Sequence, residues 1–246
     1  MNFQYISDLH LEVWHKIPNI ERSAPYLVLA GDIGDPSSKI YKMFIEYVSS
    51  IFDHVFLIAG NHEYYNYECS DNLEYLKDVD DLIRSNVSTY SNVHFLQNEI
   101  YHLTDDIIIF GSTYWTHIED DQKDLVRNKM HDYEYMNNFT TEKCNQLHDL
   151  AIKKLEQYYL EYTNKRWLLV FHHLPKLELV LPKYKNINYI SGFASTNYPK
   201  ILDDNNVLAI IYGHTHTPSI QGKYYTNPIG YPSENMLNDY NKILKL

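Results

Sequence analysis

The sequence predicts an α/β protein in which several strands end at one place in the fold. Apolar runs of strand length alternate with segments whose apolar residues recur at helical spacing, a pattern typical of α/β construction. Five of the apolar runs are followed at once by Asp, Asn or His. Because sites in open α/β sheets form beyond the carboxyl ends of the strands, we expect these five ends to converge on a single site.

The first 63 residues are predicted to form strand, strand, helix and strand. The strands are expected at 3–7, 26–30 and 55–59. A helix is expected up to residue 51, because apolar residues recur at helical spacing at Ile40, Met43, Phe44, Tyr47, Val48 and Ile51. Each strand leads into polar residues, namely Asp8-Leu9-His10, Gly31-Asp32 and Gly60-Asn61-His62-Glu63.

The middle of the chain changes to antiparallel character. A second helix is expected over 69–85, followed by short strands over 93–96, 99–103 and 107–110, the last two forming a hairpin. Residues 112–139 show no clean period, which favours an irregular insert able to wall a substrate cleft.

In the last hundred residues, predicted helices and strands alternate again. The longest helix is expected over 141–162, and it feeds a strand at 167–171 that ends in His172-His173. Residues 176–200 contain two prolines and no steady period, so we expect a region of loops and short helices beside the site. A strand over 207–212 delivers Gly213-His214-Thr215-His216. A strand at 222–226, a turn at 227–231 and a weakly indicated helix in the tail complete the chain.

Composition narrows the class of protein. The 246 residues are 44% hydrophobic, enough for a real core, and we expect a single domain over 1–246. The formal charge of −11 opposes loose binding to long nucleic acid. Two cysteines, Cys69 and Cys144, are too few for a disulfide framework, which favours a reducing compartment. We recognise no signal peptide and no apolar run of membrane length. We therefore expect a soluble cytoplasmic protein without a membrane partner.

Each polar segment is ambiguous when taken singly. Asp8 and His10 occupy alternate positions, where extended backbone would point both side chains the same way, but Asp-x-His is frequent by chance. Asp32 could be an ordinary turn residue, and His172 or His173 could be a histidine of the core. Asn61 offers a neutral oxygen ligand, with His62 projecting to the other side toward a substrate. The pair His214 and His216 resembles a metal-binding pair more than a core.

The five segments together resemble the signature of the calcineurin-like metallophosphoesterase superfamily. The order Asp-x-His, Gly-Asp, Gly-Asn-His-Glu, His and Gly-His-x-His spans residues 8 to 216. The resemblance implies a four-layer α/β sandwich, with two mixed β-sheets packed face to face and flanked by helices. It also implies hydrolysis of phosphate esters at a centre of two metal ions.

The resemblance assigns ligands residue by residue. Asp8, His10 and His216 would hold one ion, Asn61, His172 and His214 the other, and Asp32 would bridge both. His172 is preferred over His173 because it comes first after the strand. Nitrogen and oxygen ligands without thiolate fit Mn, Fe or Zn. The pair would activate a bridging water as hydroxide for attack on phosphorus, with His62 protonating the leaving group.

Several alternatives stay open. The substrate is expected to be a small-molecule or nucleotide phosphate ester, with monoester and diester unresolved, and the sequence indicates no oligomeric state. The same fold could serve as a metal-stabilised binding scaffold without turnover, or a single-metal site could act on carbon esters. Asp35 fits a helix-start carboxylate better than a residue that orients a site histidine. Ile229 stands where similar proteins often have Arg, so substrate preference could differ.

Overall fold

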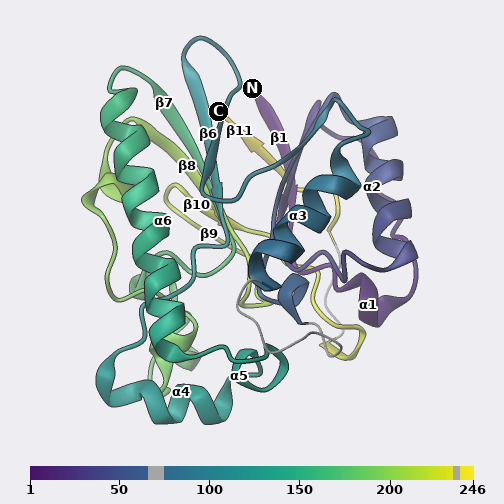
Figure 1. Cartoon of the computed structure of the whole chain (residues 1–246). Coiled ribbons are helices and arrows are strands. Elements are labelled where there is room, and N and C mark those ends of the chain that lie inside the picture. Colours follow the sequence, from purple (N-terminus) through teal and green to yellow (C-terminus); the bar gives the residue numbers. More distant parts are fainter. Residues whose placement is uncertain (66–74, 235–238) are drawn as a thin grey trace.

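The computed structural model describes residues 1–65, 75–234 and 239–246, and within them the strands form two mixed sheets (Figure 1). In the first sheet, four neighbouring strands run parallel: β1 (Asn2–Ile6), β2 (Tyr26–Ala30), β3 (His54–Ile58) and β4 (Val93–Phe95). A fifth strand, β11 (Ile243–Lys245), pairs antiparallel with β1 at the edge.

The second sheet has the strand order β5-β6-β7-β8-β10-β9. Its parallel centre consists of β6 (Ile107–Ser112), β7 (Arg166–Phe171), β8 (Val207–Tyr212) and β10 (Tyr224–Thr226). The edge strands β5 (Glu99–His102) and β9 (Ser219–Gln221) pair antiparallel with β6 and β10. The hairpin expected over 99–110 is therefore confirmed.

The sheets pack face to face with helices on both outer sides. A buried cluster joins Phe3, Val28 and Phe56 of the first sheet to Leu168 and Ile211 of the second. Helices α2 (Lys39–Ile51) and α3 (Tyr75–Val87) cover the outer face of the first sheet, and α6 (Thr141–Glu161) covers the second (Figure 1). This is the four-layer sandwich that the sequence predicts.

The long helices begin at polar caps. The Ser38 side chain accepts a hydrogen bond from the Tyr41 amide at the start of α2, and Thr140 does the same with Lys143 at the start of α6. In α2 the residues at helical spacing, Tyr41, Phe44, Ile45 and Val48, are buried. The caps and apolar faces fix where these helices start and which side packs on the sheet.

Two sequence-based expectations were wrong. The insert over 112–139 is irregular only in part: it contains α4 (Lys123–Lys129) and α5 (Asp132–Tyr135), and Val126 and Met130 are buried one turn apart. The described part of the tail forms a 3₁₀ turn at Pro232–Glu234 and then β11 rather than an α-helix, because Leu244 is drawn into the core between the sheets.

Other boundaries agree closely. The expected helix over 69–85 corresponds to α3, although residues 69–74, with Cys69, lie outside the described ranges. Residues 176–200 contain 3₁₀ turns, as expected, at Leu177–Leu179, Pro182–Tyr184, Ile190–Gly192 and Lys200–Asp203. No helix in the described ranges is long and apolar enough to span a lipid bilayer.

Candidate metal centre

The carboxyl ends of β1, β2, β3, β7 and β8 bring the predicted ligands together. The first three strands are neighbours in one sheet, and the last two are neighbours in the other. Just beyond them, Asp8, His10, Asp32, His214 and His216 all have positive φ angles, between 45° and 73°. Non-glycine residues seldom adopt this conformation, which is enriched at functional sites. The chain therefore turns sharply after β1, β2 and β8, where these residues lie.

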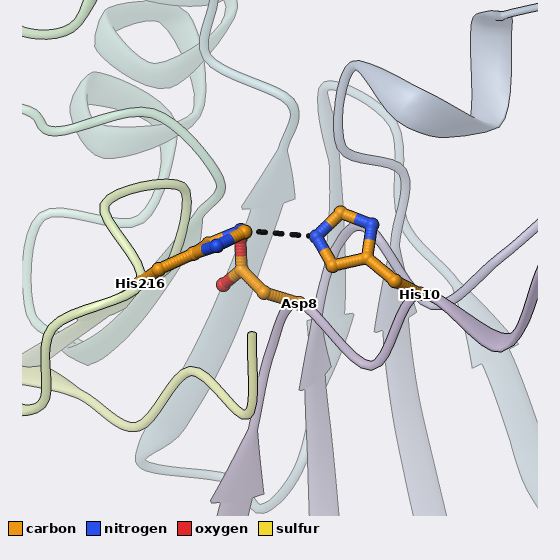
Figure 2. Close-up of side chains that lie close together, drawn as sticks. All are labelled: Asp8, His10 and His216. Carbon is orange, nitrogen blue, oxygen red and sulfur yellow. Dashed lines mark hydrogen bonds and ion pairs between the residues drawn. The ribbon is translucent and has the colours of Figure 1, made fainter. Parts of the chain in front are cut away.

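Asp8, His10 and His216 form one half of the centre (Figure 2). The Nε2 atoms of His10 and His216 lie 3.0 Å apart, and His216 Nε2 lies 3.4 Å from Asp8 Oδ1. Asp8 and His10 are fully buried. They meet through left-handed turns after β1, so the expectation that extended backbone aligns them was wrong, although the residues do converge.

Asp32, Asn61, His172 and His214 form the other half. His172 Nε2 lies 3.0 Å from Asn61 Oδ1 and 3.3 Å from Asp32 Oδ2, and His214 Nδ1 lies 3.2 Å from Asn61 Oδ1. Asp32 also approaches the first half, with Oδ2 at 3.9 Å from His10 Nε2. Asp32 thus lies between the two halves, the position expected of a bridging carboxylate.

The choice between His172 and His173 has a geometric answer. His172 faces Asp32 and Asn61, whereas His173 Nδ1 lies 3.2 Å from the carbonyl oxygen of Thr113. The His173 ring packs against the His214 ring at 4.3 Å between centroids. His173 is therefore placed as a supporting residue behind the ligands.

Hydrogen bonds to Nδ1 set the tautomer of three site histidines. His172 Nδ1 donates to the carbonyl oxygen of Ala30 at 2.9 Å, His10 Nδ1 to Glu12 Oε1 at 3.1 Å, and His216 Nδ1 to Glu234 Oε2 at 2.8 Å. Since these oxygens are acceptors, each ring carries a proton on Nδ1, which leaves Nε2 as the nitrogen available to a metal ion. Metal-binding histidines are oriented by such partners.

The resulting arrangement fits a cation. The Nε2 atoms of His10 and His216 face each other, those of His10 and His172 lie near the carboxylate of Asp32, and that of His216 lies near the carboxylate of Asp8. Buried acceptors at these separations repel unless protons or metal ions lie between them. His214 Nε2 is buried without a hydrogen-bond partner. The donor set of imidazole, carboxylate and amide oxygen suits Mn, Fe or Zn.

The carboxylates favour positive charge at the site. Burial alone would lower the pKa of His216, yet Asp8 raises that pKa to about 9. Burial would also lower the pKa of His172, but the effect of Asp32 is larger and raises that pKa to about 10. Bound metal ions would supply the positive charge that these groups attract.

The amide of Asn61 is held by the insert over 112–139. Its Nδ2 donates to Asp132 Oδ1 at 2.9 Å and to the Tyr65 hydroxyl at 2.8 Å, which turns Oδ1 toward the histidines. Asp132 is buried at the start of α5. The insert therefore orients a predicted ligand instead of forming a simple wall.

Glu63 ties the loops after β2 and β3 together. Its buried carboxylate accepts hydrogen bonds from the amides of Asp32, Ile33 and Gly60 at 3.0, 2.7 and 2.7 Å. Gly60 permits this close approach, since a Cβ there would lie 2.1 Å from Asp32 Oδ1. The Gly-Asn-His-Glu segment thus supplies a brace as well as a ligand.

His62 lies at the mouth of the site between two polar side chains. Its Nδ1 donates to Glu12 Oε1 at 3.2 Å, and its Nε2 lies 3.1 Å from the Tyr231 hydroxyl. Burial lowers the pKa of His62, but Asp32 and Glu12 more than offset this, so the pKa is raised above 6.5. Glu12 contacts both His10 and His62 and fixes their relative orientation.

The structure also shows the surroundings of Asp35 and Ile229. Asp35 accepts hydrogen bonds from Ser37 before α2 and does not contact a site histidine, as the helix-start interpretation predicts. Ile229 is 1% exposed and packs in the core, whereas Tyr231, two residues later, faces the site.

Sequence reasoning missed the residues that support the ligands. Glu12, Asp132, Tyr231 and Glu234 lie in turns or short helices whose position depends on tertiary structure. Glu12 alone carried a local signal, since it lies two residues after His10. The others approach their partners from distant parts of the chain.

Comparison with known proteins identifies the family of this chain. The family model for calcineurin-like phosphoesterases matches residues 1–218. An uncharacterized protein of Acanthamoeba polyphaga mimivirus is 30% identical over 272 residues, covering 96% of this chain and 94% of that protein.

Solved structures share the fold at low sequence identity. The phosphopantetheinyl hydrolase of Mycobacterium tuberculosis superposes with a TM-score of 0.71 at 14% identity, covering 96% of this chain and 93% of that chain. The TT1561 protein of Thermus thermophilus gives a TM-score of 0.51 at 12% identity, over 95% and 90% of the two chains. Since the family model covers most of the sequence, the chain belongs to the calcineurin-like phosphoesterase family.

Proposed function

We propose that this protein hydrolyses phosphate esters at a centre of two divalent metal ions. The observation that carries the proposal is the convergence of three Nε2 lone pairs, from His10, His172 and His216, on the carboxylates of Asp8 and Asp32. Such a set binds cations, and among the described residues Asp32 belongs to two groups that could hold an ion, one with His172 and His214 and one with His10 and His62. A single catalytic domain over 1–246 would suffice.

The ligand groups suggest how the ions would be held. Asp8, His10 and His216 would hold one, Asn61, His172 and His214 the other, and Asp32 would contact both. Bound there, Mn, Fe or Zn would act as Lewis acids that lower the pKa of water and offset charge on the phosphoryl oxygens.

His62 is the proposed proton donor to the leaving group. It lies beside the ligands, with its ring centroid 4.4 Å from that of His10. Glu12 accepts a hydrogen bond from Nδ1, which leaves Nε2 directed toward Tyr231 and the site mouth. A protonated Nε2 can transfer its proton to the departing alkoxide, and Tyr231 keeps the imidazole oriented.

The proposed substrates are small phosphate esters, and long nucleic acid is disfavoured by the charge of −11. A binding scaffold without turnover is a weaker alternative. Such a protein would not need His62, yet His62 is present beside the site, with a polar partner at each ring nitrogen.

Turnover of p-nitrophenyl phosphate and bis-p-nitrophenyl phosphate by chelator-stripped protein tests the proposal. We expect activity to return with Mn and two metal ions per chain to be counted by elemental analysis. Asp32→Asn should lower kcat/KM at least about 100-fold and reduce the metal count, because it removes the shared ligand.

Asp35→Asn is the matched control. Asp35 lies three residues from Asp32, but it bonds only within the turn before α2 among its described contacts. Full activity of Asp32→Asn with two ions retained would refute the site assignment. Two bound ions in the unmodified chain with neither ester cleaved would favour the scaffold.

A further inference from the structure

A cavity opens directly beside the candidate metal centre. Its volume is about 320 Å³, within the range of small-molecule sites. His214 and His216 form part of its wall, so the cavity and the metal centre are continuous. A molecule bound through a phosphoryl group at the ligands would extend into this space.

Most of the remaining wall is apolar. It includes six aliphatic side chains: Leu174, Leu179, Val180, Leu181, Ile187 and Ile190. Phe193 adds an aromatic ring, whose centroid lies 5.8 Å from that of His214. This wall suits a hydrocarbon or aromatic group, because burying apolar area is favourable in proportion to that area.

The cavity is poorly suited to a second anionic group. None of the described residues that line it is Lys or Arg, and Glu234 lies on its wall next to His216. A carboxylate or second phosphate moved into this space would lose its hydration without gaining an opposite charge.

The wall is built into the fold rather than resting on the surface. Leu174, Leu179, Val180 and Ile190 belong to the core cluster on the outer face of the second sheet. A parallel bridge between Leu174 and Ala194 closes the segment that carries them. The cavity therefore exists before any ligand binds, which lowers the entropic cost of binding.

We propose that this cavity is the specificity pocket of the enzyme, and that it binds the uncharged, apolar organic group of the phosphate ester. The inference rests on the proposed function, because it places the phosphoryl group at the metal centre. It narrows the substrate class to esters whose organic part is an aryl or branched-alkyl group without a second charge.

Binding of phosphonates to Mn-loaded protein, measured by calorimetry, tests this inference independently of turnover. Methylphosphonate reports on the metal centre alone, phenylphosphonate adds an apolar group, and 2-carboxyethylphosphonate adds a charged one. We expect phenylphosphonate to bind at least about tenfold more tightly than methylphosphonate, the gain expected for burying one aromatic ring. The carboxyethyl compound should bind no more tightly than methylphosphonate.

Two leucine variants locate the effect. Leu181→Lys places an ammonium group in the cavity wall, whereas Leu177→Lys alters a residue that is 38% exposed, in the same segment, and not on the wall. Leu181→Lys should lose most of the preference for the phenyl group and bind the carboxyethyl compound several-fold more tightly. Leu177→Lys should behave like the unmodified chain, and methylphosphonate should bind all three proteins equally.

The outcomes separate the two proposals. Equal affinities for methylphosphonate and phenylphosphonate would overturn the specificity pocket while leaving the metal centre intact. A phenyl preference that survives equally in both lysine variants would place the apolar site elsewhere and overturn the assignment. If none of the phosphonates binds the metal-loaded protein, the proposed function fails, and this inference fails with it.

Discussion

Backbone conformation at single residues shapes the candidate site. Five predicted ligands hold positive φ angles, each of which costs about 1–3 kcal/mol where the surroundings impose it. The sequence motifs predict Asp8, His10 and Asp32 as ligands but do not predict these angles, because left-handed turns depend on the packing around them. The expectation that Asp8 and His10 lie on extended backbone was wrong for this reason, although the predicted ligands converge.

His62→Ala tests the proton donor at the residue scale. We expect kcat to fall about 10²- to 10⁴-fold for alkyl phosphates, whose leaving group needs a proton. The loss should be much smaller for p-nitrophenyl phosphate, because its leaving group is stable as an anion. Rates for both esters, with metals counted in each protein, provide the measurement.

His15→Ala is the control, since His15 is an exposed histidine close in sequence to His10. An equal loss with both leaving groups would reject His62 as the acid. A reduced metal count in His62→Ala would instead assign His62 a structural part in the centre.

At the scale of secondary structure, the elements predicted best are those with a strong period. The helices α2 and α6 and the strands that deliver ligands agree with the sequence to within a few residues. The edge strands β9 and β11 have only three residues each and are half exposed, so they carry little pattern of their own. Their pairing with β10 and β1 is decided by tertiary contacts.

A histidine pair on neighbouring strands predicts an acid-sensitive element far from the metal centre. His54 Nδ1 on β3 lies 2.9 Å from His94 Nε2 on β4, and both rings stack on Phe56. Burial, with a smaller effect of His54, lowers the pKa of His94 to about 4.

The direction of the stability change follows from this shift. The unfolded chain binds a proton at His94 near pH 6.5, whereas the folded chain does so only near pH 4. Stability is therefore present above pH 6.5 and falls as the pH drops toward 4. His94→Phe should reduce the fall in Tm between pH 7.5 and pH 5.0, measured on chelator-stripped protein by calorimetry.

The exposed His102 on β5 supplies the comparison for this experiment. His102→Phe should leave the fall in Tm unchanged, because its ring is not held away from water. An identical pH response in His94→Phe and the unmodified chain would show that His94 titrates normally in the folded state.

At the scale of the whole molecule, the ligands link the two sheets. Asp8, His10, Asp32 and Asn61 follow strands of the first sheet, and His172, His214 and His216 follow strands of the second. The order of motifs along the chain was enough to predict this set. The supporting residues Asp132 and Glu234 could not be predicted, because no local pattern in the sequence links them to Asn61 and His216, which lie 71 and 18 residues away.

This arrangement predicts that metal ions stabilise the fold itself. A ligand at 100 times its dissociation constant stabilises the folded state by about 2.7 kcal/mol per site, and unfolding separates ligands of the two sheets. For a chain of this length, two filled sites should raise Tm by about 10 °C or more over chelator-stripped protein. Calorimetry with increasing Mn measures the shift. Asp32→Asn should show at most half of it, because the shared ligand serves both ions, and an unchanged shift would mean that the stabilising ions bind elsewhere.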